Sequence, residues 1–294
     1  YTLDEALELV EPGEYIHLSD GTYTGGLKPL GGGKDGSPIK IYGGRDAIIT
    51  GKNPVVNIEH SWITLKGFTV NGKYGDNDVY DSYLNKCVWV KGQGTSTNSA
   101  LEGFVMKGMM VHNCGGECVR LRNFVVEAEI RDNEIYDCGV YDFQFGSSGK
   151  NGEAIYVGTA SELWDDGVED QCLDNHITGN VMETNGNECV DIKEGSSGNL
   201  VEYNECSNQL DDESGCYDSR GDDNTFRYNK ATDCVGAGVR LGGDTVKGYT
   251  YGTGNSVYEN TFKRSEAGGI NLQVSPQSDT CGNDCYDGPC DLFG

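Results

Sequence analysis

Five charged residues recur at short intervals in the second half of the sequence, namely Asp191, Lys193, Asp218, Arg220 and Arg240. Carboxylates that lie side by side can hold a divalent cation such as calcium, because hard cations prefer oxygen ligands. A lysine beside an arginine has a lowered pKa, since like charges repel, and an uncharged amine can accept a proton. The alternative is a set of ion pairs on the surface of a sheet, each contributing about 0.2–1 kcal/mol. Both interpretations require that the five side chains share one face.

The sequence around these residues repeats itself. Asparagine motifs such as NHITGNVMET, NLVEYNECSN, NTFRYNKATD and NSVYENTFKR contain Asn180, Asn204, Asn229 and Asn260, at spacings of 24, 25 and 31 residues. A repeat of this length indicates a solenoid. Each unit holds short runs of β-branched residues separated by glycine, asparagine and aspartate, which is the pattern of strands joined by turns. We expect the asparagines to form an internal hydrogen-bonded ladder that satisfies the backbone of the turns.

A second set of segments follows the asparagine motifs and resembles one strand position visited by successive coils. The segments are ECVRLRN, EAIYVGT, ECVDIKE, GCYDSRG, AGVRLGG and GGINLQV, which begin at positions 117, 153, 188, 215, 237 and 268. Side chains alternate between the two faces of a strand, so Val190 and Ile192 would point inward. One outward column would then hold Arg120, Tyr156, Asp191, Asp218, Arg240 and Asn271, and the column two residues on Arg122, Lys193, Arg220 and Gln273. We therefore expect a compact, charged, solvent-facing surface.

These patterns predict an all-β fold, a right-handed parallel β-helix with a short N-terminal capping helix, in a single domain of residues 1–294. Residues 1–14 form the predicted cap, with an amphipathic helix near residues 3–10 that would cover the open end of the core. Residues 15–275 would form the coils, and residues 276–294 a cysteine-rich C-terminal segment.

Cysteine content and charge limit the compartment and the partners. Twelve cysteines favour disulfide bonds in a secreted, extracellular protein. We expect most of them to be oxidised, with at least one bond within Cys281, Cys285 and Cys290 or from that cluster to the nearby coil. A bond between Cys189 and Cys216 is geometrically plausible, because they fall at the same place in neighbouring coils.

The net charge of −25 makes nucleic acid a poor partner and calcium a suitable one. No segment has the apolar length that spans a bilayer.

Four runs of sequence resemble the ordered motifs of one polysaccharide lyase family, which contains chondroitinase B and the β-helical alginate lyases. They are NGEAIYVGTAS (151–161), ECVDIKEGSSGNLVEYN (188–204), SRGDDNTFRYN (219–229) and GAGVRLGGD (236–244). Their order and approximate spacing match over roughly residues 150–262. In that family an asparagine and two acidic residues bind calcium, a lysine abstracts a proton and an arginine assists.

The resemblance implies a role for individual residues by position. Glu188 and Asp191 correspond to the acidic calcium ligands, with Asn180 as the remaining ligand. Lys193 corresponds to the base and Arg220 to the assisting arginine. The sequence also departs from the family pattern: the acidic pair is three residues apart rather than two, the lysine lies closer to the acids, and a glycine follows the arginine where the family usually has histidine.

The resemblance thus implies a secreted lyase that cleaves an acidic, uronic-acid-containing polysaccharide by β-elimination, with Ca²⁺ as its expected cofactor. Arg120, Arg122 and Arg240 on the same face would hold the carbohydrate, and Tyr156 would hold the sugar or help the leaving oxygen depart. A non-catalytic extracellular protein that binds glycans, or undergoes self-assembly into a structural fibre or coat, would show the same repeats and disulfides. A glycoside hydrolase or an epimerase on the same fold is a third alternative, and hydrolysis would use Asp191 and Asp218 as its carboxylate pair.

Overall fold

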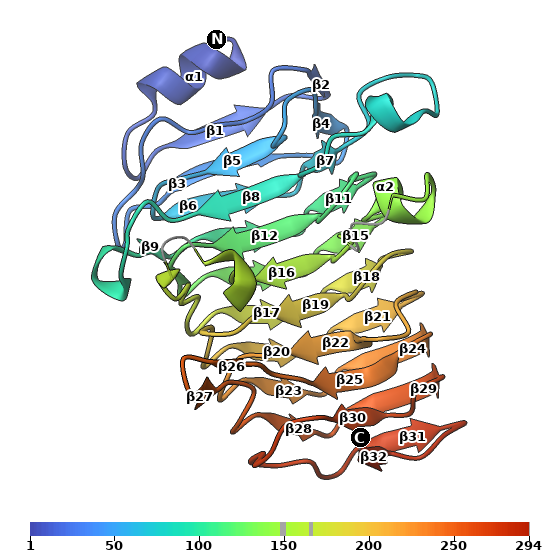
Figure 1. The fold of residues 1–294 in the computed structure, drawn as a ribbon. Coiled ribbons are helices and arrows are strands. Elements are labelled where there is room, and N and C mark those ends of the chain that lie inside the picture. The colour runs from blue at the N-terminus through green and yellow to red at the C-terminus, as the bar shows by residue number, and fades with distance from the viewer. Residues whose placement is uncertain (148–150, 165–166, 294) are drawn as a thin grey trace.

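The computed structural model describes residues 1–147, 151–164 and 167–293. The chain winds through three parallel sheets, and each main strand pairs with the equivalent strand of the next coil. Figure 1 shows the coils stacked from the N-terminal to the C-terminal end. The molecule is therefore a parallel β-helix, as the sequence repeats predict.

Within the described residues the three sheets contain nine, ten and nine strands. The first sheet contains β1 (Tyr15–Leu18), β3 (Ile39–Gly43), β6 (Ile63–Lys66), β10 (Val105–Lys107), β14 (Glu129–Arg131), β17 (His176–Thr178), β20 (Leu200–Glu202), β23 (Thr225–Arg227) and β28 (Ser256–Tyr258). The second contains β2 (Gly21–Tyr23), β4 (Ala47–Ile49), β7 (Thr69–Asn71), β11 (Met110–His112), β15 (Glu134–Tyr136), β18 (Val181–Glu183), β21 (Glu205–Ser207), β24 (Lys230–Cys234), β29 (Thr261–Ser265) and β31 (Asp284–Tyr286). The third contains β5 (Val56–Ile58), β8 (Val88–Lys91), β12 (Val119–Arg122), β16 (Ile155–Val157), β19 (Val190–Ile192), β22 (Gly215–Ser219), β25 (Ala237–Leu241), β30 (Ile270–Leu272) and β32 (Asp291–Phe293).

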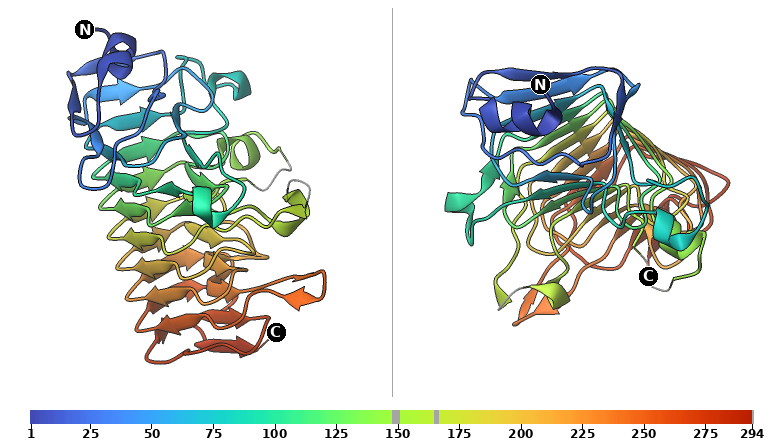
Figure 2. Two further views of the ribbon diagram at one scale, coloured as in Figure 1. Left: turned by 90° about the vertical axis from the view of Figure 1, so that its left-hand side faces the viewer. Right: turned by 90° about the horizontal axis from the view of Figure 1, so that it is seen from above.

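Shorter elements lie in the turns between the sheets. They are α2 (Val140–Phe143), the 3₁₀ helices η1 (Tyr80–Ser82), η2 (Thr97–Ser99) and η3 (Ser161–Leu163), the parallel pair β9 (Leu101–Glu102) and β13 (Val125–Val126), and the hairpin β26 (Thr245–Val246) and β27 (Tyr249–Thr250). Figure 2 shows α2 and the orange hairpin standing out from the stacked coils. No helix in the described part of the chain is long and apolar enough to cross a membrane.

The helix α1 (Leu3–Leu9) covers the N-terminal end of the coils, as the sequence predicts. It begins with a capping box, in which the Thr2 hydroxyl accepts a hydrogen bond from the Glu5 amide and the Glu5 carboxylate accepts one from the Thr2 amide. Leu7 is buried on the side that faces the core. Figure 2 shows the helix lying across the end of the stack when viewed along the axis.

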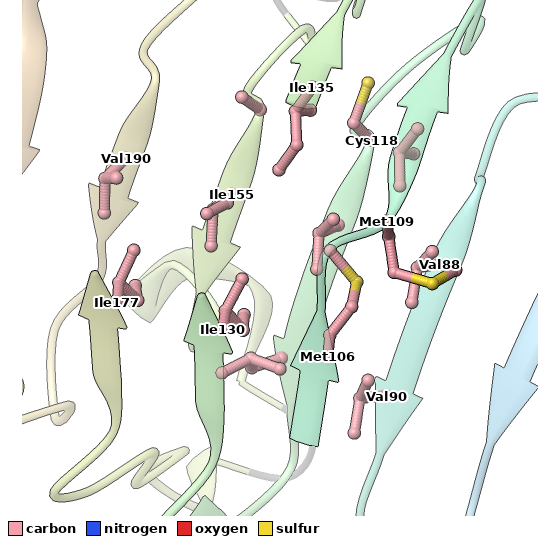
Figure 3. Packing of buried hydrophobic residues seen from close by; sticks show 14 of the residues in the cluster. Val88, Val90, Met106, Met109, Cys118, Ile130, Ile135, Ile155, Ile177 and Val190 are labelled. Carbon is pink, nitrogen blue, oxygen red and sulfur yellow. The ribbon is translucent and has the colours of Figure 1, made fainter. Parts of the chain in front are cut away.

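The core consists of the side chains that point inward from all three sheets. The inward column of the third sheet is Val88, Val119, Ile155, Val190, Tyr217, Val239 and Ile270, all buried. Figure 3 shows Val88, Ile155 and Val190 in the core with Ile130 and Ile177 of the first sheet. A slip of one residue would turn this whole column toward solvent, so the core fixes which residues face outward.

Two ladders of asparagines, all buried except the half-buried Asn283, run along the corners of the coils and confirm the predicted internal ladder. One consists of Asn133, Asn180, Asn204, Asn229, Asn260 and Asn283, and the other of Asn175, Asn199, Asn224 and Asn255. In the first ladder each Oδ1 after that of Asn133 accepts hydrogen bonds from the backbone and side-chain nitrogens of the asparagine one coil before it. These bonds satisfy polar groups that the turns would otherwise bury unpaired.

Five disulfides are present in the described part of the chain: Cys87–Cys114, Cys118–Cys138, Cys189–Cys206, Cys216–Cys234 and Cys285–Cys290. Most cysteines are thus oxidised, and the predicted bond within the C-terminal cluster is confirmed. The prediction of a Cys189–Cys216 bond is wrong. Both side chains point into the core, where they meet cysteines of the second sheet rather than each other. The first four bonds each join one coil to the next.

Removing one of these inter-coil bonds should lower the free energy of unfolding. The Cys118→Ser/Cys138→Ser variant opens a bond with a sequence separation of 20, and we expect a loss of about 2–4 kcal/mol, measured by denaturant titration. Cys281→Ser is the matched control, because Cys281 is exposed and forms no disulfide in the described chain. Equal stability of the double variant and the control would show that the bond contributes little to the folded state.

Candidate active site

The outward side chains of the third sheet form the columns that strand alternation predicts. Backbone pairing aligns Arg120, Tyr156, Asp191, Asp218, Arg240 and Asn271, one residue per coil. Asp191 of β19 lies beside Asp218 of β22, and Asp218 lies beside Arg240 of β25. Lys193 and Arg220 follow two residues after the aspartates. The predicted common face is therefore present, and Figure 1 shows its strands one below another.

The expectation that this face is open to solvent is wrong for its acidic residues. Asp191 and Asp218 are both 0% exposed, and Lys193 is 9% exposed. Adjacent coils lie only about 4.8 Å apart, so the longer side chains of one coil cover the shorter ones of the next. The Arg240 guanidinium covers Asp218, with which it forms an ion pair. The site is a buried set of compensating charges rather than an open charged surface.

Three carboxylates meet at the centre of this face: Glu153, Glu188 and Asp191. One oxygen of each lies within 4.8 Å of the others, and all three residues are buried. Burial and then the charges of Asp191 and Asp218 raise the pKa of Glu188 to about 8. Burial and the Glu188 charge likewise raise the pKa of Glu153 well above its usual range. The Ser214 hydroxyl donates to Glu188 and is also 3.1 Å from an Asp218 oxygen.

Lys193 is held against this cluster. Its Nζ lies 2.5 Å from Oδ2 of Asp191 and 4.9 Å from the centre of the Tyr156 ring. Burial lowers the pKa of Lys193, but the Asp191 charge opposes burial and leaves that pKa above its usual value. Arg220 does lower the pKa of Lys193, as the sequence predicts, but the expected net decrease is wrong because the Asp191 charge outweighs that effect. The Asp191 carboxylate has the larger effect of the two neighbours on the lysine.

The two arginines on the C-terminal side of the cluster are partly exposed. An Nη of Arg220 lies 3.1 Å from Glu194, and the Arg220 side chain is 20% exposed. Arg240 pairs with Asp218, donates to the Glu213 carbonyl at 2.6 Å and has a 17% exposed side chain. Each guanidinium thus presents part of its surface to solvent beside the acidic cluster. That is the arrangement needed to bind a carboxylate of a ligand.

On the N-terminal side, Arg120 serves a packing role. Its guanidinium lies 3.9 Å from the centre of the Tyr156 ring and 5.4 Å from that of Trp89, and it forms an ion pair with Glu117. Its side chain is only 7% exposed. These contacts orient Tyr156, which is 6% exposed. Burial raises the pKa of Tyr156, so its hydroxyl stays protonated at neutral pH.

The structure separates two further predicted residues from this cluster. Asn180 lies in the buried asparagine ladder, where its side chain donates to the Ile130 carbonyl and accepts from Asn133. Its amide is therefore engaged at the corner between the first and second sheets, away from the third-sheet acids. Arg122 donates to the side chain of Asn123 at 3.2 Å and borders a small pocket of about 180 Å³ lined also by Trp164.

Glu153, Glu194 and Ser214 were missed from the sequence. Glu153 precedes Tyr156 by the same three residues that separate Glu188 from Asp191, and Glu117 stands in the same place before Arg120. A glutamate thus recurs three residues before the outward position in three successive coils, and aligning the coil sequences reveals it. Strict alternation hides it, because a residue three positions before an outward one is expected to face inward. The chain at these glutamates has not yet entered the strand, so the turn directs them outward.

The acidic cluster fits a hard divalent cation such as Ca²⁺. Its donor atoms are carboxylate oxygens, the ligands that Ca²⁺ prefers. Within the described residues, Oδ1 of Asp191 is buried and accepts no hydrogen bond. Lys193 contacts the other oxygen of this carboxylate, Oδ2. A buried oxygen left without a partner is costly unless a proton or a cation satisfies it. Glu153, Glu188 and Asp191 would hold the ion.

Comparison with known proteins shows a similarity of fold. No protein-family model and no curated protein sequence matches the chain. An alginate lyase from Paenibacillus sp. strain FPU-7 matches in structure with a TM-score of 0.80 and 21% identity, over 98% of this chain and 93% of that one. A PL6 alginate lyase in complex with a trisaccharide matches with a TM-score of 0.59 and 15% identity, over 94% and 54%. A pectate lyase, Pel9A, matches with a TM-score of 0.53 and 14% identity, over 95% and 73%. The chain is thus similar in fold to alginate and pectate lyases.

Proposed function

We propose that this protein is a secreted, Ca²⁺-dependent polysaccharide lyase that cleaves a uronic-acid-containing polysaccharide by β-elimination. The observation that carries the proposal is the buried trio Glu153, Glu188 and Asp191 beside Lys193 and Arg220, on the outward face of a fold shared with alginate lyases. Export is consistent with the five disulfides, since such bonds persist in oxidising compartments.

β-Elimination removes the proton on the carbon next to the uronate carboxylate and expels the oxygen on the following carbon, which leaves a double bond. Negative charge develops on the carboxylate, so positive charge placed beside it lowers the barrier. The partly exposed guanidinium groups of Arg220 and Arg240 are suited to bind that carboxylate. A bound Ca²⁺ would supply further charge neutralisation at this point.

Lys193 is the residue best placed to take the proton. A base must be uncharged, and the Asp191 carboxylate at 2.5 Å favours the charged form. Lys193 can therefore accept a proton only when the Asp191 carboxylate pairs with another cation instead. Asp191 thus sets the protonation state of the base. Tyr156, whose hydroxyl stays protonated, is suited to donate a proton to the departing oxygen.

The proposal is tested by incubating the protein with a panel of uronic-acid polymers, including alginate and polygalacturonate, with and without Ca²⁺. Cleavage is followed by the ultraviolet absorbance of the unsaturated product. We expect an increase for at least one polymer, and its loss when a chelator removes the ion. Absence of cleavage on every polymer, together with absence of Ca²⁺ binding by calorimetry, would favour a non-catalytic glycan-binding or structural protein instead.

A further inference from the structure

A second outward surface, on the first sheet, concentrates positive charge in a chain of net charge −25. Backbone pairing of β1, β3, β6, β10 and β14 aligns His17, Tyr42, Lys66, Lys107 and Arg131 in one column, one residue per coil. Lys40 lies in the adjacent outward column, beside Tyr15. We call these seven residues the basic face. It lies on a different sheet from the acidic cluster.

The lysines of the basic face differ from the cations of the candidate active site, because they lack carboxylate partners among the described residues. Lys193, Arg220 and Arg240 each pair with a buried carboxylate. Within the residues that the structure describes, no carboxylate lies at ion-pair distance from Lys40, Lys66 or Lys107. Lys40 and Lys66 are exposed and Lys107 is half-buried. These ammonium groups are open to an anionic partner.

Aromatic rings border these cations at the N-terminal end of the same face. The rings of Tyr15 and Tyr42 lie 5.7 Å apart, and those of His17 and Tyr42 lie 4.9 Å apart. Tyr15 is 67% exposed, a large apolar ring in contact with water. Exposed aromatic rings offer flat apolar surfaces with a polar edge, on which the C–H face of a sugar ring can pack. Cations and rings in one row suit a ligand that carries both carboxylates and sugar rings.

We propose that the basic face binds an acidic polysaccharide at a site separate from the candidate active site. Coils repeat about every 4.8 Å, so the column places Lys66, Lys107 and Arg131 at regular steps along the axis of the molecule. A polymer with a carboxylate on each sugar can lie along this column and meet one cation after another. Arg131 also contacts Glu129 at 2.6 Å, which makes the two lysines the main contributors. The choice of a uronic-acid polymer as the ligand rests on the proposed function. The positive charge of the face is observed independently of that proposal.

The test compares two charge-reversal variants with the same net charge. Lys66→Glu/Lys107→Glu alters the basic face, and Lys230→Glu/Lys263→Glu makes the same change at exposed lysines on the second sheet. Both are made in a Lys193→Ala background, so that the polymer is not consumed. Binding is measured by retardation in gels that contain alginate or polygalacturonate, with neutral dextran as the control polymer. We expect the first variant to bind about 10-fold more weakly and the second to bind as the parent does.

The possible outcomes separate this proposal from the proposed function. Equal weakening of both variants would show only a long-range effect of net charge and would overturn the proposal, as would absence of retardation in the parent protein. Equal retardation by duplex DNA would show a general polyanion surface rather than a polysaccharide site. Because the assay measures binding alone, a protein that cleaves no polymer can still confirm the basic face. A lyase whose binding survives the first variant refutes the basic face and leaves its catalytic role intact.

Discussion

Lys193→Ala is expected to reduce the rate of polymer cleavage about 10³-fold, because general-base catalysis typically contributes about 10²–10⁴-fold. The amine of Lys193 is held beside the acidic cluster by Asp191, and its neighbours on either side are Tyr156 and Arg220. The loss should appear in kcat with little change in KM, since proton transfer rather than binding is affected. Initial rates of formation of the unsaturated product measure both constants.

Lys230→Ala is the matched control for this experiment. Lys230 also forms an ion pair, with Glu205 at 2.7 Å, but on the exposed surface of the second sheet. We expect it to retain parental activity. Undiminished cleavage by Lys193→Ala would contradict the base assignment. A loss of activity that matches an equal loss of folded protein, followed by circular dichroism, would show that the lysine supports the fold instead.

In the absence of Ca²⁺, thermal stability is expected to fall as the pH rises from about 5 to about 8. The pKa of Glu188 is raised to about 8 by burial and by the charges of Asp191 and Asp218. A carboxyl group with a higher pKa in the folded than in the unfolded chain contributes stability that is fully present below its unfolded pKa. That contribution is lost as the pH rises through the folded pKa. We expect a decrease in Tm on the order of 5 °C, measured in EDTA.

Addition of Ca²⁺ at the upper end of this pH range should restore the lost stability, because a cation replaces the protons on the carboxylates. Glu188→Gln cannot lose a proton, so its Tm in EDTA should vary less with pH than that of the parent. If the parent shows no fall in Tm across this range, the carboxylates are not held in the protonated state described here. If Mg²⁺ and Ca²⁺ raise the Tm equally, the site lacks the calcium preference we propose.

The alignment of the site residues could be predicted from the sequence because two simple rules determine it. Alternation of side chains and a buried inward column together require Asp191, Asp218 and Arg240 to point outward at adjacent positions. The capping helix was predictable for a similar reason, since its amphipathic pattern and the Thr2–Glu5 capping box are local. Both depend on neighbours in sequence or on a strict repeat.

Other features depend on the path of the chain between the strands. The position of Glu153 follows from a turn and not from alternation. Cys189 forms its disulfide with Cys206 because its side chain points toward the second sheet. The burial of Asp191 follows from the side chains that cover it, Lys193 among them. None of these is encoded in a short window of sequence, so the geometry of the coils had to be known first.

The strand register also determines where this molecule can grow or shorten. Tyr156, Asp191, Asp218 and Arg240 come from four consecutive coils, each paired directly with the next. An extra coil inserted between β16 and β25 would keep every backbone hydrogen bond of the sheets, yet would push the members of the site apart by about 4.8 Å. A coil added near β3 or β6 would leave the candidate active site undisturbed, although it would move the residues of the basic face apart. We therefore expect a designed gain or loss of a coil to preserve the candidate active site when it is made near the N-terminus, and to disrupt that site when it is made between β16 and β25.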